Sequence, residues 1–249
     1  MNTTNNTILI TGGSAGIGFE FAKALSANNK IIITGRNEAR LKAAAAKLPN
    51  TTAILGDVAN EKDVEQLVAT LNKDHKDLNI VINNAGKSAP VYNLAAEGVD
   101  AYTKAGEEML VNYLSIIRLN EKLLPLLKKQ KEAAIVNVSS IVAVAPGGRL
   151  PSYSASKAAL HSYTITLRQH LADTSIKVFE VYPPLVATEF SAEIGGLTNG
   201  IPASVVADDL VKGLEQNNFD IRVGQTAELY QFYLANPQEA IKAMSGAEA

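Results

Sequence analysis

The sequence contains no cysteine and only three histidines among its 249 residues. Without cysteine, disulfide bonds, thiolate catalysis and cysteine-based metal sites are all excluded. The histidines, His75, His161 and His170, have no spacing that is typical of metal ligands, so we predict no bound metal. We interpret His161 and His170 as packing or surface residues, because neither belongs to a recognisable catalytic group.

The sequence also lacks an excess of basic charge and any long apolar run. Its formal net charge is −2, which leaves nothing to neutralise the phosphates of nucleic acid or an anionic membrane surface. Residues 1–6 have neither the basic start nor the apolar run of a secretory signal. No apolar stretch reaches the roughly 20 residues of a membrane span. We therefore expect a cytoplasmic protein with no nucleic-acid or membrane partner.

Short apolar runs rich in isoleucine and valine alternate with longer helical patterns along the chain. Most runs are continuous rather than alternating, as in strands that are buried on both faces of a sheet. Within Glu61–Asn72, apolar residues recur at the spacing of one helix face. The repetition predicts right-handed crossovers and a parallel sheet covered on both sides. The expected strands are Thr7–Thr11, Lys30–Thr34, Thr51–Leu55, Asn79–Ile82, Ala133–Ser139, Ile176–Tyr182 and Asp220–Val223.

No linker rich in glycine, proline or serine divides the chain, and no internal repeat is present. We therefore predict one domain over residues 1–249. Two segments interrupt the alternation of strands and helices. Residues 100–129 form one long helical pattern, and residues 188–204 hold three glycines and a proline. The second segment follows a strand end, which is where an open α/β sheet binds ligands, so we predict a substrate loop at about 188–204.

A glycine-rich turn joins the first expected strand to a helix expected at Phe19–Ala27. Its glycines have the spacing G-x-x-x-G-x-G, with Gly12, Gly16 and Gly18 as the three fixed positions. Gly12 permits a tight turn, Gly16 lets the backbone approach a pyrophosphate, and Gly18 lets the helix pack closely on the sheet. The helix N-terminus presents free N–H groups and a positive dipole end to phosphates. The alternative is a glycine-rich turn that binds no ligand.

The end of the second expected strand indicates which dinucleotide binds. NAD is usually held by an acidic residue about 20 positions after the glycine turn, which accepts from the ribose hydroxyl. Here the strand ends in Gly35 and Arg36 follows at once. A guanidinium matches a phosphate in charge and in bidentate geometry, so Arg36 favours NADP(H) over NAD(H). The alternative is that Arg36 is only a solvated loop charge.

Three residues in the later part of the chain form a candidate catalytic group. Tyr153 and Lys157 have helical i, i+4 spacing, so both side chains project from one face of a helix. An ammonium one turn away, together with a positive nicotinamide, would lower the pKa of the tyrosine and make it a usable proton donor. Ser140, after the fifth expected strand, would hold the substrate oxygen beside it. The tyrosine–lysine pair is weak evidence alone and gains its meaning from the motifs before it.

With these motifs in order, residues 6–225 resemble the short-chain dehydrogenase/reductase family. The resemblance rests on Thr11-Gly12, Gly16-Ile17-Gly18, Asp57-Val58, Asn83-Asn84-Ala85-Gly86, Asn112, Ser140 and Tyr153-x-x-x-Lys157. It implies a single Rossmann-type, doubly wound α/β domain with a seven-stranded parallel sheet in the order 3-2-1-4-5-6-7. It also implies that Tyr153 is the general acid and base, that Lys157 binds the nicotinamide ribose, and that Ser140 rather than Ser139 orients the substrate. Asn112 would hold a water that links Lys157 to solvent.

The resemblance also implies a cofactor site. Asp57 and Val58 would contact the adenine, Asn84 the adenosine ribose and Thr188 the nicotinamide carboxamide. The implied cofactor contacts are Gly12, Ser14, Gly16, Ile17, Gly18, Arg36, Asp57, Val58, Asn84, Ala85, Gly86, Tyr153, Lys157, Pro183, Val186 and Thr188.

One departure from the family pattern lies after the sixth expected strand. Many members have Pro-Gly there, whereas this chain has Pro183-Pro184, which makes the turn more rigid and removes one N–H donor. This resembles the bacterial branch named after the D-alanylation locus of teichoic acid, a name that establishes no substrate. By the same resemblance, helices at about Ala105–Lys129 and Tyr153–Ala172 would pair in a homodimer or homotetramer.

These observations predict an NADP(H)-dependent oxidoreductase that interconverts a carbonyl and an alcohol on a small molecule. A different class of protein would keep the dinucleotide site and use it only to sense the cofactor, without catalysis. The complete set of Asn112, Ser140, Tyr153 and Lys157 argues against such a sensor, because sensing needs no tyrosine–lysine pair.

Overall fold

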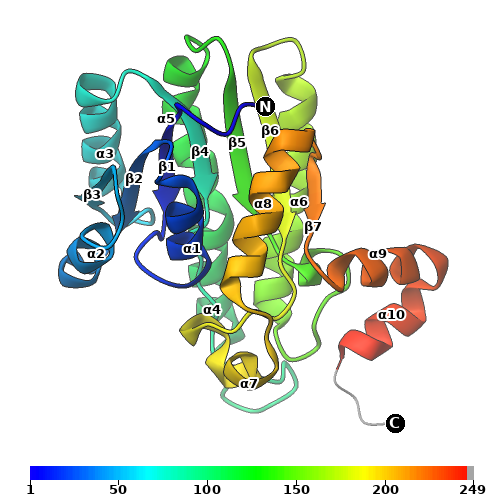
Figure 1. Ribbon diagram of the computed structural model, residues 1–249. Helices are drawn as coiled ribbons and strands as arrows, with labels where there is room; N and C mark the ends of the chain where they lie inside the picture. Colours follow the sequence, from blue (N-terminus) through cyan, green and yellow to red (C-terminus); the bar gives the residue numbers. More distant parts are fainter. Residues whose placement is uncertain (246–249) are drawn as a thin grey trace.

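The protein is built on one parallel sheet of seven strands. The computed structural model describes residues 1–245, and its sheet has the order β3-β2-β1-β4-β5-β6-β7 (Figure 1). This confirms the predicted fold class and strand order. The strands are β1 (Thr7–Thr11), β2 (Lys30–Gly35), β3 (Thr51–Leu55), β4 (Leu78–Asn83), β5 (Ala133–Val138), β6 (Ile176–Tyr182) and β7 (Asp220–Arg222).

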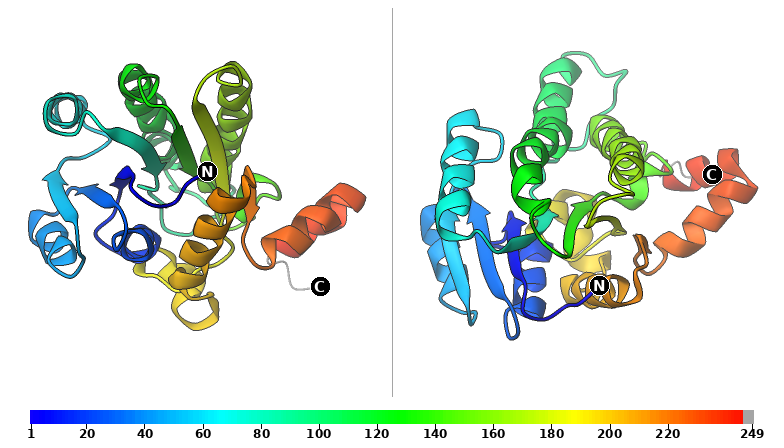
Figure 2. Two further views of the ribbon diagram at one scale, coloured as in Figure 1. Left: turned by 45° about the horizontal axis from the view of Figure 1, so that its top comes forward. Right: turned by 90° about the horizontal axis from the view of Figure 1, so that it is seen from above.

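Helices cover both faces of the sheet, so successive residues of a central strand are buried in different layers. In β1, Ile8 and Ile10 face one apolar cluster and Leu9 faces the other. The two layers are visible in the left view of Figure 2. One layer contains α1 (Gly16–Leu25), α2 (Glu38–Ala45) and α8 (Ala203–Gln216); the other contains α3 (Glu61–Asp74), α5 (Ser115–Leu127) and α6 (Pro151–His170).

Several boundaries differ from those expected. Strand β3 is only partly buried because it lies at the edge of the sheet, whereas β1 and β5 are buried throughout. Helix α1 begins at Gly16 rather than Phe19. The first turn of a helix needs no i−4 partners for its N–H groups, so poor helix formers are tolerated there. The last two glycines of the turn, Gly16 and Gly18, therefore belong to the first turn of α1.

The long helical segment is interrupted where an unbroken α-helix was expected. Helix α4 (Ala101–Met109) continues through a π-helical turn, η1 (Leu110–Leu114), into α5. Single π-helical turns inside α-helices are rare, and many of those that do occur lie at functional sites. The periodicity of apolar residues cannot reveal such a turn, because it shifts the register by only one residue.

The segment at 188–204 is more ordered than the expected irregular loop. It contains a 3-10 helix, η3 (Glu189–Ile194), and a short helix, α7 (Gly196–Asn199). Gly195 has a φ of +80° and ends η3 in the left-handed region. A parallel bridge between Val186 and Ile201 closes the segment at its base. The predicted substrate loop is therefore a compact helical flap, joined at both ends to the body.

Two further helices follow β7. Helices α9 (Thr226–Ala235) and α10 (Pro237–Met244) extend away from the sheet in both figures. The end of α10 returns to the loop before α6, where the Gly148 N–H donates to the Met244 carbonyl over 3.4 Å. The predicted domain ends at residue 249, and residues 246–249 lie outside the described residues, so the extent of the domain stays a prediction. None of the helices in residues 1–245 combines the length and apolar character that a bilayer crossing requires.

Candidate active site

The candidate site lies at the carboxyl ends of the central strands. Strand β1 pairs with β2 on one side and β4 on the other, so the crossovers diverge between β1 and β4. Open α/β sheets bind ligands at this kind of switch point. Gly12 follows β1, Asn84 follows β4 and Ser140 lies two residues beyond the end of β5. The fold therefore brings the glycine turn and the candidate catalytic residues to one edge.

The glycine turn has the conformation that its spacing predicts. Gly12 and Gly16 have φ values of +67° and +54°, which side chains rarely tolerate. A Cβ on Gly18 would lie 2.4 Å from Asn84 Nδ2 and 2.5 Å from the Gly12 carbonyl oxygen. Gly18 is thus required for close packing of α1 against the ends of β1 and β4.

The N-terminus of α1 fits a bound pyrophosphate. Its N-cap residue, Ala15, makes no side-chain cap, and its first turn contains no acidic residue, within the part of the chain that the structure describes. The helix dipole and the N–H groups of the first turn are therefore available to an anion. A Cβ on Gly16 would lie 3.3 Å from Thr188 Cγ2, which places the flap segment beside this turn. The residues present thus fit a dinucleotide: Gly12, Ser14, Gly16, Ile17 and Thr188 would hold it.

The predicted adenosine side lies at the ends of β2 and β3. Ser14 Oγ is 3.6 Å from the position of a Cβ on Gly35, the last residue of β2. The glycine turn therefore lies beside the end of β2, where Arg36 follows Gly35. The Arg36 side chain is exposed. Asp57 is partly buried and accepts a hydrogen bond from the Ala59 N–H over 2.9 Å.

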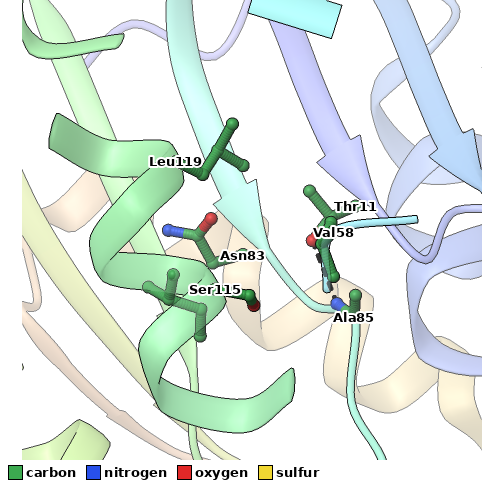
Figure 3. Close-up of a pocket in the computed structure, with 7 residues that line it drawn as sticks. Thr11, Val58, Asn83, Ala85, Ser115 and Leu119 are labelled. Atoms are coloured by element: carbon green, nitrogen blue, oxygen red, sulfur yellow. Dashed lines mark hydrogen bonds between the residues drawn. The ribbon is translucent and has the colours of Figure 1, made fainter. Parts of the chain in front are cut away.

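A narrow gap, too small to hold a water molecule, lies at the switch point between β1 and β4 (Figure 3). Thr11, Val58 and Ala85 lie on one side of it, and Ser115 and Leu119 of α5 lie on the other. The structure thus brings together two predicted cofactor contacts, Val58 and Ala85, that are 27 positions apart in the sequence.

Asn84 ties the end of β4 to the glycine turn. Its side-chain Nδ2 donates to the Thr11 carbonyl over 2.9 Å and to the Gly12 carbonyl over 3.3 Å. The backbone N–H groups of Asn84 and Ala85 both donate to Thr11 Oγ1 over 3.0 Å. The amide nitrogen of Asn84 is therefore committed to the protein, and its predicted contact with the ribose stays a prediction.

Ser140, Tyr153 and Lys157 meet beside the end of β5. Lys157 is buried, and its Nζ donates to the Val138 carbonyl over 2.9 Å and lies 5.7 Å from the centre of the Tyr153 ring. The Ser140 side chain lies close enough to the Tyr153 hydroxyl to lower the pKa of that group. The neighbouring Ser139 hydroxyl instead donates to the Val181 carbonyl of β6 over 3.3 Å. Of the two serines, Ser140 is thus the one whose side chain affects the pKa of the tyrosine.

Burial and neighbouring charges shift the pKa values of Tyr153 and Lys157 in opposite directions. Burial raises the pKa of Tyr153 above its usual range. The nearby Ser140 side chain opposes this effect, and the negative charge of Glu108 adds to it. Burial also lowers the pKa of Lys157 to about 8, against the opposing effect of Glu180. The protein alone therefore keeps Tyr153 protonated. The predicted lowering of its pKa would need the positive nicotinamide as well as Lys157.

Asn112 lies in the π-helical turn and is fully buried. Its Oδ1 accepts from the Lys87 N–H over 2.8 Å, and its Nδ2 donates to the Lys87 carbonyl over 2.8 Å and to Ser156 Oγ over 2.9 Å. These bonds clamp the loop after β4 onto α6. Because the side chain is occupied by protein groups, the predicted relay water would have to bind elsewhere on Asn112, and the relay stays a prediction.

The structure also reveals neighbours of the site that the sequence did not indicate. Glu108, one helical turn before Asn112, is buried and accepts hydrogen bonds from the Ala89 N–H, over 2.7 Å, and from the Ser152 hydroxyl. Phe190 of η3 lies against Tyr153, with ring centroids 5.9 Å apart. No motif marks either residue, because each reaches the site only through the packing of α4 or η3 on α6.

Buried amides join four elements behind the site. Asn83 Nδ2 donates to Asn137 Oδ1 over 2.8 Å and to Asn120 Oδ1 over 3.0 Å, and Asn137 Nδ2 donates to Thr164 Oγ1 over 2.9 Å. This amide network links β4, β5, α5 and α6. Such a network fixes the relative positions of the elements that carry Ser140 and Tyr153.

The remaining predicted contacts, Pro183 and Val186, lie after β6 and are buried. The Pro183 carbonyl accepts from the Ile141 N–H over 2.9 Å, which holds the Pro183-Pro184 turn against the residue that follows Ser140. The structure also shows an ion pair of 2.7 Å between Arg40 of α2 and Glu189 of η3, which the sequence did not indicate. Among residues 1–245, no cluster of three or more histidine, aspartate or glutamate side chains could hold a metal ion.

Comparisons with known proteins agree with this geometry. The short chain dehydrogenase family matches residues 6–196. A relative named "Uncharacterized oxidoreductase DltE", from Bacillus subtilis, is 41% identical over 226 residues, which cover 89% of this chain and 89% of the relative. This relative supports the predicted branch.

Two solved structures share the fold over nearly the whole chain. A short chain dehydrogenase from Burkholderia cenocepacia, in complex with NADP, is 28% identical, with a TM-score of 0.85 over 98% of this chain and 99% of that one. A short chain dehydrogenase/reductase from Burkholderia phymatum, in complex with NAD, is 20% identical, with a TM-score of 0.84 over 100% of this chain and 98% of that one. The second likeness shows the fold alone. The two structures contain different dinucleotides, so they do not decide the choice of cofactor.

Proposed function

The chain belongs to the short-chain dehydrogenase/reductase family, a family of nicotinamide-dependent oxidoreductases, and on that premise we propose that it interconverts a carbonyl and an alcohol with NADP(H). The observation that carries the proposal is the meeting of Ser140, Tyr153 and Lys157 beside a glycine turn and an uncapped helix N-terminus.

Each residue of this group has a distinct role in the proposal. Tyr153 donates a proton to the carbonyl oxygen during reduction and accepts it during oxidation. Its raised pKa keeps the hydroxyl protonated in the free enzyme, which suits the donor. Ser140 hydrogen-bonds the same oxygen and holds it next to Tyr153. The nicotinamide, when bound, supplies or takes up the hydride.

Lys157 acts from beneath the tyrosine. A pKa of about 8 keeps much of its side chain charged near neutral pH despite burial. The ammonium would hydrogen-bond the nicotinamide ribose and stabilise the Tyr153 phenolate once a positive nicotinamide is present. Asn112 holds the loop after β4 and α6 in register, through Lys87 and Ser156, so that the tyrosine faces the cofactor.

The preference for NADP(H) rests on Arg36. Arg36 is exposed directly after β2, and its neighbour Gly35 lies near Ser14, so its guanidinium could bind a 2′-phosphate on the adenosine ribose. An acidic residue at this place would repel that phosphate, and the chain has none there.

A substrate screen tests the proposed function. Purified protein is mixed with NADPH or NADH and a panel of ketones and aldehydes, and with NADP⁺ or NAD⁺ and alcohols, and cofactor oxidation or reduction is followed. We expect turnover of at least one carbonyl with NADPH, and its loss in Tyr153→Phe with cofactor binding retained. Binding of NADPH without turnover across the panel would favour the rival function, a dinucleotide sensor.

We further propose that the protein acts in the cytoplasm as a homodimer or homotetramer, with the substrate bound under the flap at 188–204. The large apolar side chains of Leu114, in the π-helical turn before α5, and of Ile165, on α6, are exposed, which supports association. Sedimentation velocity tests it: a single species at the mass of the monomer would contradict it.

A further inference from the structure

Glu180 of β6 is a fully buried carboxylate that the proposed reaction does not use. One carboxylate oxygen lies 3.0 Å from His161 Nδ1 on α6. The other, Oε1, has no hydrogen-bond partner among the groups of residues 1–245. Burying an ionised carboxylate is costly unless a cation lies close by. The environment of Glu180 must therefore supply positive charge.

Glu180 faces the helix that carries the catalytic residues. Tyr153, Lys157 and His161 are spaced by four residues along α6, so they lie one above another on the same face. His161 at one end of this row contacts Glu180. Lys157 is in the middle of the row, one helical turn from each of the other two. Among residues 1–245, the direct ion pair of Glu180 is with His161, and Lys157 Nζ instead donates to the Val138 carbonyl.

The sheet register independently places Glu180 near the ammonium group. Asn137 of β5 is the partner of Glu180 in β6. The next residue of β5, Val138, provides the carbonyl that accepts from Lys157 Nζ over 2.9 Å. The ammonium is thus anchored one residue from the strand position that is paired with Glu180.

We propose that Glu180 is a positioning residue: its carboxylate is the buried counter-charge that keeps Lys157 protonated and in place beneath Tyr153, and His161 orients that carboxylate from the side. The idea deepens the proposed function, because it rests on Lys157 as the partner of Tyr153. Nothing in the tyrosine–lysine motif requires an acidic residue on β6, so this is a property of the present chain.

The direction of the pKa shifts agrees with this arrangement. Burial lowers the pKa of Lys157 to about 8, and the charge of Glu180 opposes that effect. The hydrogen bond that the Glu180 carboxylate accepts from His161 raises the pKa of His161 above its usual value. The other ionisable groups that face this cluster are Tyr182 of β6, Asp220 and Arg222 of β7, and, toward Tyr153, Glu108 of α4.

Titration of Lys157 in Glu180 variants tests the proposal. The substitution Glu180→Gln keeps the shape and a hydrogen-bond acceptor for His161 but removes the charge. An opposite charge within a few ångströms typically shifts a pKa by about one unit or more. We expect the Lys157 midpoint, followed by NMR of isotope-labelled lysine and assigned with Lys157→Met, to fall by about one pH unit. The alkaline limb of kcat/KM for carbonyl reduction should move down with it.

Two further variants separate charge from packing. Glu180→Asp keeps the charge at a greater distance, so its midpoint should lie between those of Glu180→Gln and the native protein. Glu132→Gln is the matched control, because Glu132 is partly exposed and its carboxylate pairs with Lys177 over 2.9 Å on β6. This control should not move the Lys157 midpoint.

The outcomes distinguish the two proposals. An unchanged Lys157 midpoint in a folded Glu180→Gln protein, or an equal shift in Glu132→Gln, would overturn the role of Glu180. Should Glu180→Gln fail to fold, the smaller downward shift in Glu180→Asp decides, and its absence overturns the idea equally. Absence of carbonyl turnover in the native protein would contradict the proposed function alone, because the lysine titration needs no turnover.

Discussion

The nucleotide half of the molecule, from β1 to β3, and the catalytic half, from β4 to β6, build their parts of the site in different ways. In the first half the backbone forms the site: two glycines with positive φ shape the turn, and an uncapped helix N-terminus follows it. In the second half buried polar side chains support the site, among them Asn83, Asn137 and Glu180. The nucleotide half therefore depends on space and backbone geometry, and the catalytic half depends on hydrogen bonds and charge among buried side chains.

The largest expected effect is in the catalytic half. Lys157→Met removes the buried ammonium but keeps a side chain of similar length. We expect kcat to fall by about 10³-fold, because Tyr153 loses its cationic partner. We also expect thermal stability to fall, because the buried Glu180 carboxylate loses its counter-charge and the Val138 carbonyl loses its donor. Steady-state kinetics and thermal unfolding on the same samples check this.

Lys23→Met is the control for the loss of one charge, because Lys23 is exposed on α1. It should leave both quantities near their native values. Native-like turnover in Lys157→Met would contradict the role of Lys157 as the cationic partner of Tyr153.

The amide network should produce the next largest effect, on stability. Asn137→Ala removes an acceptor from Asn83 and a donor to Thr164 in a fully buried place. Leaving such groups unsatisfied should lower the free energy of unfolding by about 3 kcal/mol. Chemical denaturation measures this. Asn72→Ala, on the exposed side of α3, is the matched control and should change stability by less than about 0.5 kcal/mol. Equal changes in the free energy of unfolding for the two variants would contradict a stabilising role of the amide network.

A smaller effect is expected in the nucleotide half, where space is limiting. Gly18→Ala places a Cβ 2.5 Å from the Gly12 carbonyl oxygen, so the turn must shift. We expect a loss of about 2 kcal/mol in stability and weaker NADPH binding, measured by denaturation and by fluorescence titration. Gly106→Ala, at a helical position of α4 with open space around it, should instead be stabilising by about 0.5–1 kcal/mol. Native-like NADPH affinity in Gly18→Ala would contradict the role of the tight turn.

The smallest expected effect concerns the choice of cofactor. Arg36→Ala should reduce the ratio of NADP(H) to NAD(H) affinity by about tenfold, because the 2′-phosphate loses a charged partner at an exposed position. Calorimetric titration with both cofactors provides the ratio. Lys42→Ala, an exposed residue of α2 that pairs with Glu38, controls for loss of charge. An unchanged ratio in Arg36→Ala would leave Arg36 as a solvated loop charge.

The same contrast explains what could be predicted from the sequence. The fold class and the position of the glycine turn were predicted because continuous apolar runs and glycine spacing are local patterns, whereas the strand order came from the family resemblance. The π-helical turn around Asn112 and the helices in the flap were not, because a shift of one residue or a short 3-10 helix leaves no periodic signal.

The predicted site is only partly visible in local patterns. Tyr153, Lys157 and Ser140 could be named because their spacing is a motif. Glu180 could not, because it contacts α6 only after β6 is placed in the sheet. His161 was interpreted as a packing or surface residue, and its bond to Glu180 emerges from the folded chain alone. Buried polar pairs between distant elements are therefore the part of such a site that needs the structure.

Deuterium transfer tests the central claim most directly. The protein is incubated with NADPH deuterated at the transferable position and a carbonyl found in the screen, and the product alcohol is analysed by mass spectrometry. The account predicts deuterium on the carbinol carbon with the native protein, and a rate lower by at least about 10³-fold with Tyr153→Phe at unchanged NADPH affinity. Equal rates for the two proteins, or an alcohol without deuterium, would contradict it.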